Sequence, residues 1–148
     1  MTRRSLLPFL LLFCFTAQTA SAACEFDIEV SDSLAFSVEE MTAEADCGSV
    51  TVNLSHTGRL PAAAMGHNWV LTRPEDFQPV AKAGGQAGLE ADYLPPEDER
   101  VIAATRILGG GEQDSIEFSL EGLEPGDYTF FCSFPGHWSV MKGTFRIP

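Results

Sequence analysis

A cysteine, a histidine and a methionine lie close together near the C-terminus of this 148-residue chain, and their side chains are common metal ligands. Cys132 and His137 are separated by four residues, and Met141 follows His137 after three more. A thiolate, imidazoles and a thioether are the donor set that suits a copper ion cycling between Cu(I) and Cu(II). The run therefore predicts one-electron chemistry if a second imidazole joins these three side chains in space.

His67 is the candidate for the second imidazole. Its neighbour Gly66 has no side chain, so the Gly66 carbonyl could approach the metal opposite Met141 as a weak axial contact. On the other side, the Asn68 amide is expected to hydrogen-bond to Ser133 and so to hold the two ligand loops together. Outer contacts of this kind orient and tune the residues that hold a metal.

The segment between Cys132 and His137 is expected to be a tight turn, because it contains Pro135 and Gly136. Such a turn would bring the thiolate and the imidazole to one point from the two sides of a loop. Phe134, in the same turn, is assigned to the shell of residues around the ligands.

Each of these residues also has an ordinary structural explanation. A methionine entering a strand commonly fills a gap in a core, and a free cysteine often behaves as a small buried apolar residue. A nucleophilic pair of Cys132 and His137 is the enzymatic alternative. The presence of Met141 and His67 argues against that alternative. The remaining histidine, His56, is expected to be partly buried with a structural hydrogen bond and no metal role, because no companion ligand lies near it in sequence.

Residues 1–22 have the features of a cleavable secretory signal. Two arginines precede a short apolar stretch, and small residues follow it up to Ala22, or up to Ala23 if cleavage falls one residue later. The apolar stretch is shorter than the roughly 20 residues that a membrane span needs, and no later segment approaches that length. We therefore expect an exported, soluble protein of the periplasm with one domain over residues 23–148.

Cleavage would leave three cysteines, because Cys14 lies inside the signal, where bulky preceding residues make lipid anchoring a minor alternative. In an exported protein two cysteines are expected to pair and one to remain. Cys24 and Cys47 are the natural pair, since each flanks a strand-like segment, and their disulfide would contribute about 3 kcal/mol. Cys132 is then the odd cysteine, which would be reactive, intermolecular or bound to metal.

The chain is strongly acidic. Its net charge of −12 becomes −14 after loss of the signal, which contains two arginines and no acidic residue. Such a surface repels nucleic acids and anionic membranes, and it attracts basic partners through a long-range field that weakens with salt. The run Glu97-Asp98-Glu99 is interpreted as a solvated charged segment, and no carboxylate pair indicates acid–base catalysis.

Short segments of alternating polar and apolar residues predict about eight strands separated by turns that contain glycine or proline. They cover residues 25–30, 35–38, 49–55, 68–71, 101–105, 115–120, 127–132 and 142–147. The alternation is typical of sheets with one wet and one packed face, and it indicates an all-β sandwich or barrel with Greek-key connections. A short external helix is expected over about residues 74–83.

At several places the sequence resembles the azurins, which are periplasmic cupredoxins. The similar segments are Val52-Asn-Leu-Ser-His-Thr-Gly58, Met65-Gly-His-Asn-Trp-Val-Leu71, Val101-Ile-Ala103, Phe130-Phe-Cys-Ser-Phe-Pro-Gly-His137 and Met141-Lys-Gly-Thr144. The resemblance covers essentially the whole mature chain, and it implies an eight-stranded sandwich with an external helix and a single type 1, or blue, copper. It also implies that His67, Cys132 and His137 are the equatorial ligands of the copper. Met141 is then the axial ligand, with the Gly66 carbonyl opposite it, and Cys24 and Cys47 form a disulfide.

Two positions depart from the pattern of this family. Trp138 follows the C-terminal ligand histidine, where azurins usually have a small residue, and it could enlarge an apolar face. Ala104 stands where well-known members have a surface histidine, so no metal-related role is carried over to that position.

These observations together predict a periplasmic electron carrier, not an enzyme, that transfers one electron at a time between redox partners. Its expected partners are c-type cytochromes or copper or haem reductases with basic surfaces, bound through a small, transient interface by a monomer. An apolar patch around His137 would form this interface, with the members Leu60, Ala64, Met65, Phe134, Pro135, Gly136 and Trp138. Periplasmic copper storage or delivery is the alternative; a fragment of a copper oxidase or nitrite reductase is disfavoured, because a catalytic copper centre needs further histidines.

Overall fold

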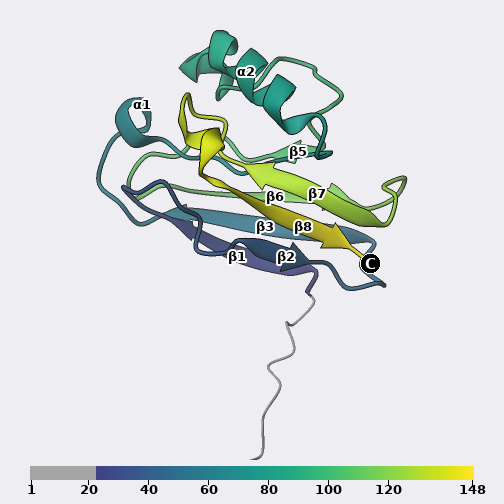
Figure 1. Cartoon of the computed structure of the whole chain (residues 1–148). Coiled ribbons are helices and arrows are strands. Elements are labelled where there is room, and N and C mark those ends of the chain that lie inside the picture. The colour runs from purple at the N-terminus through teal and green to yellow at the C-terminus, as the bar shows by residue number, and fades with distance from the viewer. Residues whose placement is uncertain (1–22) are drawn as a thin grey trace, which may run out of the picture.

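Two β-sheets form a sandwich in the computed structural model, which describes residues 23–148 (Figure 1). The predicted signal over residues 1–22 lies outside the described residues. The strands are β1 (Glu25–Val30), β2 (Glu40–Thr42), β3 (Ser49–His56), β4 (Val70–Thr72), β5 (Ala103–Ala104), β6 (Gln113–Ser119), β7 (Gly126–Phe131) and β8 (Lys142–Ile147). One sheet has the order β1-β3-β6 and the other the order β2-β8-β7-β4-β5, which confirms the predicted β-sandwich.

The chain crosses repeatedly between the two sheets. β1 and β3 are parallel neighbours, although β2 lies between them in sequence and pairs in parallel with β8 of the other sheet. β7 lies between β8 and β4 and is antiparallel to both. In this register Val70 of β4 is opposite Phe131 of β7. The segment just before β4 and the segment just after β7 therefore meet at the same end of the sandwich.

The strand predicted over residues 35–38 is wrong, and β2 is the second strand instead. Residues 35–38 carry the chain from β1 towards the other sheet, and within them the Ser37 N–H donates to the Glu29 carbonyl at 2.9 Å. Phe36 packs its side chain into the core. One buried aromatic residue between exposed neighbours produces the same alternation as a strand, which explains the error.

The predicted external helix is present as α2 (Phe77–Ala87), which begins three residues later than expected and covers one side of the second sheet (Figure 1). Pro79 lies in its first turn, where a proline is tolerated because the first four N–H groups of a helix have no partner within the helix. The helix ends at Gly88, whose φ of 82° is readily adopted by glycine. Shorter turns of helix are α1 (Ala62–Met65), η1 (Leu89–Ala91) and η2 (His137–Ser139).

The main core lies between the sheets and is built from alternate residues of the strands. In β3, Val50, Val52 and Leu54 are fully buried, and the residues between them are partly exposed. Each such side chain contributes about 1.5–3 kcal/mol by leaving water. Trp69 is also fully buried and lies 5.9 Å from the Phe130 ring in a stacked arrangement. A second cluster lies under α2 and consists of Val70, Phe77, Val80, Ala81 and Phe131.

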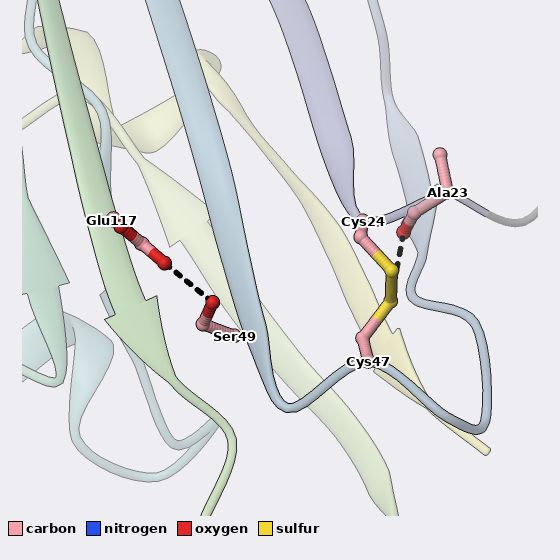
Figure 2. Close-up of a disulfide and its surroundings, with 5 residues drawn as sticks. All are labelled: Ala23, Cys24, Cys47, Ser49 and Glu117. Carbon is pink, nitrogen blue, oxygen red and sulfur yellow. Dashed lines mark hydrogen bonds between the residues drawn. A yellow bond between two sulfur atoms is a disulfide. The ribbon is translucent and has the colours of Figure 1, made fainter.

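The predicted disulfide between Cys24 and Cys47 is confirmed, and its Cα atoms are 5.7 Å apart. It joins the start of β1 to the turn before β3, close to the contact between the Ser49 hydroxyl and the Glu117 carboxylate (Figure 2). Cys132 is the free, buried cysteine of the described residues. Among the helices of residues 23–148, none is long and apolar enough to cross a membrane.

Candidate metal centre

Three potential metal ligands meet at one end of the sandwich. Cys132 follows β7 directly, His67 lies in the segment between α1 and β4, and His137 begins η2. Their ligand atoms all lie within 4.8 Å of one another. The Nδ1 atoms of His67 and His137 are each 3.7 Å from the Cys132 Sγ atom. The register between β4 and β7 thus brings together residues that are 65 positions apart in sequence.

A main-chain carbonyl fixes the orientation of the His67 ring. The His67 Nε2 atom lies 2.9 Å from the Ser31 carbonyl oxygen. Because a carbonyl only accepts hydrogen bonds, Nε2 carries the proton, and the unprotonated Nδ1 lone pair faces the Cys132 sulfur. Sequence reasoning missed Ser31, since its contribution is made by the backbone and leaves no side-chain signal.

Ring contacts restrict the two imidazoles further. The His67 and His137 rings have centroids 5.0 Å apart, and the Phe134 ring stacks on His137 at 4.3 Å. His67 is fully buried, and only 6% of His137 is exposed. His137 therefore has one small exposed area, and neighbouring side chains cover the rest of its ring.

The predicted structural role of His56 is confirmed, since it is buried and makes two hydrogen bonds. The Gly58 N–H donates to His56 Nδ1 at 3.1 Å, so the proton is on Nε2, which donates to the Met65 carbonyl at 3.0 Å. Its ring stacks on His67 at 5.2 Å. His56 is absent from the group of residues 23–148 whose ligand atoms converge.

Burial keeps the potential ligands uncharged. It raises the pKa of the Cys132 thiol to about 12, although the main-chain N–H groups of Asn68 and Phe134 bond to the sulfur and oppose the shift. The pKa of His67 is lowered to about 4, first by burial and then by the nearby His137, against the opposing effect of the Ser31 carbonyl. Burial also lowers the pKa of His137. Near neutral pH both imidazoles therefore have free lone pairs, and a metal would displace the thiol proton.

The residues that follow His67 and Cys132 are joined by hydrogen bonds. Asn68 donates through its side-chain nitrogen to the Ser133 hydroxyl at 2.8 Å, and its side-chain oxygen accepts from the Ser133 N–H at 2.8 Å. Asn68 and Ser133 are both fully buried. The structure thus connects the two loops through the pair of residues that the sequence analysis selected.

Gly66 and Met141 lie beside the same cysteine. The Gly66 carbonyl oxygen is 3.9 Å from the Cys132 sulfur. A side chain at Gly66 would collide with the Ala62 carbonyl oxygen, so glycine is required by the close approach of α1. Met141 is buried in the same core cluster as Cys132, and its carbonyl accepts the Cys132 N–H at 3.1 Å.

Comparisons with known proteins agree with a copper site at this position. The family model described as copper binding proteins, plastocyanin/azurin family, matches residues 22–148. The chain is 51% identical to an azurin of Alcaligenes faecalis over 126 residues, which cover 84% of this chain and 98% of the relative. It is 45% identical to an azurin of Pseudomonas aeruginosa over 97% of this chain and 98% of the relative.

A solved structure extends the similarity to the fold. The azurin of Methylomonas sp. strain J superposes with a TM-score of 0.82 at 42% sequence identity, covering 86% of this chain and 99% of that one. The chain belongs to the copper-binding plastocyanin/azurin family. Family membership supports its classification as an electron-transfer copper protein without substrate turnover of its own.

The donor set of this family member suits copper. One thiol and two neutral imidazoles provide the soft sulfur and the nitrogen donors that copper accepts in both of its common oxidation states. The site is also dry, because His67 and Cys132 have no exposed surface. The described residues thus fit the metal that the family binds.

The residues selected for the apolar patch differ in exposure. Leu60, Ala64, Pro135 and Gly136 are exposed, whereas Met65, Phe134 and Trp138 are partly buried. The Trp138 ring lies edge-on to Phe77 of α2, with centroids 6.0 Å apart. Val140 was not among the predicted patch residues, although it is 62% exposed between His137 and Met141. Trp138 therefore packs partly against α2, and Val140 is the more exposed apolar residue of this loop.

Proposed function

We propose that the mature protein is a periplasmic one-electron carrier with a single type 1 copper held by His67, Cys132, His137 and Met141. The Gly66 carbonyl, which lies beside the Cys132 sulfur, would be a further, weak donor. The observation that carries this proposal is the buried group of one thiol and two neutral imidazoles, whose Nδ1 atoms both face the sulfur at 3.7 Å. Bound copper supplies one-electron chemistry between Cu(I) and Cu(II).

The role of the protein is to keep the ligand positions unchanged between the two oxidation states. The Ser31 carbonyl fixes the His67 ring, and the Phe134 ring fixes His137. The Asn68 and Phe134 N–H groups stabilise negative charge on the Cys132 sulfur. Little rearrangement is then needed when an electron arrives or leaves, which favours rapid transfer.

Electrons enter and leave through the end of the molecule where His137 is 6% exposed. The exposed apolar residues Leu60, Ala64 and Pro135 belong to the docking patch, and Val140 extends it. Met65, Phe134, Gly136 and Trp138 complete it. Redox proteins with basic surfaces, such as c-type cytochromes or copper or haem reductases, are the partners that the net charge of the chain favours.

The export of the protein rests on residues 1–22, which we propose are removed as a secretory signal to leave the domain over residues 23–148. The Cys24–Cys47 disulfide supports this assignment, because such bonds form and persist in oxidising compartments. Purified periplasmic protein whose N-terminus begins at Ala23 or Cys24 would agree with the proposal.

The spectrum of the copper protein tests the ligand assignment. Cu(II) added to the purified mature protein should produce an intense thiolate-to-copper charge-transfer band in the visible region. Cys132→Ser should abolish the band, because serine offers no thiolate. The double variant Cys24→Ser/Cys47→Ser is the matched control, since it removes the other two cysteine sulfur atoms of the mature chain and should keep the band. A band that survives in Cys132→Ser would refute the assignment.

Copper storage or delivery is the second candidate, and metal exchange distinguishes it from electron transfer. A carrier should retain its copper through many redox cycles in the presence of a Cu(I) chelator. The complete burial of His67 and Cys132 favours retention, because a chelator has no direct access to them. Rapid loss of Cu(I) to the chelator would favour storage or delivery instead.

A further inference from the structure

A third loop, which contains none of the proposed ligands, reaches the hydrogen-bonded pair of Asn68 and Ser133. The Asp92 carbonyl oxygen accepts the Asn68 side-chain N–H at 3.0 Å and lies 3.2 Å from the Ser133 hydroxyl. The Asn68 amide nitrogen has two hydrogens, and the second is donated to the Ser133 hydroxyl at 2.8 Å. Asp92 therefore supplies the acceptor for the Asn68 side-chain hydrogen that Ser133 does not accept.

Asp92 can aim its carbonyl in this direction because its backbone is left-handed. Its φ is 53° and its ψ is 25°, at the end of η1. Aspartate and asparagine tolerate this conformation better than most residues other than glycine. The Asp92 N–H also donates to the Leu89 carbonyl at 2.9 Å, which closes the turn.

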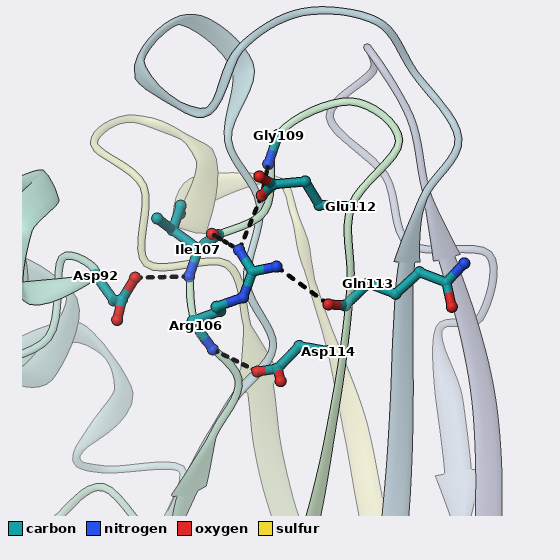
Figure 3. A network of polar contacts seen from close by, with 7 residues as sticks. All are labelled: Asp92, Arg106, Ile107, Gly109, Glu112, Gln113 and Asp114. Carbon is teal, nitrogen blue, oxygen red and sulfur yellow. Dashed lines mark hydrogen bonds and ion pairs between the residues drawn. The ribbon is translucent and has the colours of Figure 1, made fainter.

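The Asp92 side chain anchors the turn on its other side. Its carboxylate accepts the Ile107 N–H at 2.8 Å, beside the network in which Arg106 contacts Glu112 (Figure 3). The Asp92 main-chain carbonyl thus bonds to the two ligand loops, and its side chain bonds to the segment before β6. Both contacts would be disturbed if the turn rotated.

The residue after Asp92 packs against the same region. Tyr93 also has a left-handed backbone, with φ of 52°, and its ring lies edge-on to Phe134 at 5.0 Å. Its carbonyl oxygen lies so close to Gly84 of α2 that a side chain at Gly84 would collide with it. The left-handed turn is therefore held between α2 and the loop that carries Cys132 and His137.

We infer that Asp92 is a positioning residue of the metal centre, which fixes Asn68 and Ser133 and, through them, the two loops that carry His67 and Cys132. This inference rests on the proposed ligand assignment. Loss of the Asp92 anchor would leave a buried Asn68 N–H without its acceptor and loosen the Asn68 main-chain N–H that bonds to the Cys132 sulfur. A less stabilised thiolate donates more strongly to copper and favours the oxidised form.

Two substitutions at Asp92 separate its charge from its geometry. Asp92→Asn removes the charge but keeps both the left-handed preference and a side-chain oxygen for the Ile107 N–H. Asp92→Ala removes the charge, the acceptor and the preference. Glu97→Ala is the matched control, because Glu97 is an exposed acid in the same loop and also has a left-handed backbone, with φ of 55°.

Two measurements follow. In the metal-free protein, Asp92→Ala should speed hydrogen exchange of the Ser133 N–H, which donates to Asn68, by about tenfold, while Asp92→Asn and Glu97→Ala stay within about twofold. In the copper protein, Asp92→Ala should lower the ratio of reduced to oxidised protein at a fixed mediator potential by about threefold more than Asp92→Asn does, equivalent to about 28 mV.

The outcomes are distinguishable. Equal effects of Asp92→Ala and Asp92→Asn would reduce the role of Asp92 to its charge, and unchanged exchange in Asp92→Ala would refute the positioning role outright. Failure of the wild-type protein to form the thiolate–copper band would instead refute the proposed function and leave the exchange result standing. If Asp92→Ala does not fold, Asp92→Gly, which accepts the left-handed turn but has no side-chain acceptor for the Ile107 N–H, should still raise the exchange rate by about threefold.

Discussion

The two ends of the sandwich are ordered by different kinds of interaction. At the end that carries the proposed copper ligands, the ligand end, polar groups from three loops form hydrogen bonds with one another, as in the contacts among Asn68, Ser133 and Asp92. At the opposite end, a covalent bond joins Cys24 to Cys47, and the nearby strands carry exposed ion pairs such as that of Arg146 with Asp127 at 2.7 Å.

This difference separates function from stability. The contacts at the ligand end act by direction and distance, so small displacements there change the chemistry of the site. The disulfide acts mainly by restricting the unfolded chain, so its loss should change stability without altering the site. Substitutions at the disulfide end should therefore change stability and leave the chemistry of the site unchanged.

The largest expected effect on stability is at the disulfide end. Removal of the Cys24–Cys47 bond by serine substitution at both positions should lower the free energy of unfolding by about 3 kcal/mol, because the unfolded chain gains conformational freedom. Denaturant titration of the metal-free protein measures the loss. The visible spectrum and the midpoint potential of the copper protein should stay unchanged, and a shifted potential would contradict the separation of the two ends.

A smaller effect is expected when acid acts on the ligand end. The pKa of His67 is lowered to about 4 in the folded metal-free protein, so the unfolded chain binds more protons between about pH 4 and pH 6.5. Stability should therefore fall as the pH is lowered through this window and should stay unaffected by His67 above it. Allowing for solvent screening, we expect a loss of about 1 kcal/mol between pH 7 and pH 5.5.

Denaturant titrations of the metal-free protein at the two pH values measure this loss. His67→Gln, which cannot be protonated in this range, should reduce the pH dependence, leaving the part due to His137, whose pKa is lowered in the same direction. The same pH dependence in the wild type and in His67→Gln would show that burial of His67 has no part in it.

The smallest effect concerns partner docking. Ala64→Asp places a charge on the proposed docking patch, and Ala45→Asp makes the same substitution at an exposed position near the disulfide. Electron transfer with a c-type cytochrome should be about fourfold slower for Ala64→Asp than for Ala45→Asp, which corresponds to the roughly 0.8 kcal/mol of one buried methyl group. Stopped-flow kinetics measure both rates, and equal rates would exclude Ala64 from the interface.

The sequence predicted those parts of the fold that depend on local alternation and on cysteine count. The bounds of β1 and β8 agree with the prediction, and the Cys24–Cys47 pair was expected because each cysteine flanks a strand-like segment. The segment around Phe36 was misassigned, because a buried aromatic residue in a crossing segment has the same local pattern as a strand. The start of α2 was misplaced because Pro74 and Pro79 are both compatible with the beginning of a helix.

In the candidate metal centre, the sequence reveals the contributions of side chains but not those of the main chain. The chemical types of His67, Cys132, His137 and Met141 are visible in the sequence, because donor atoms belong to side chains. The Ser31 and Asp92 contributions come from main-chain carbonyl oxygens, which every residue has, so no residue type signals them. They could be identified only from the folded chain.

The sequence by itself therefore determined which donor atoms this protein has, how many cysteines can pair, and the sign of its surface charge. The tertiary structure decided which atoms meet, because the register of β4 on β7 brings His67 to Cys132 across the sheet. It also decided their protonation, since the pKa shifts of His67 and Cys132 arise from burial, which depends on the packing of the whole chain and not on neighbouring residues in sequence.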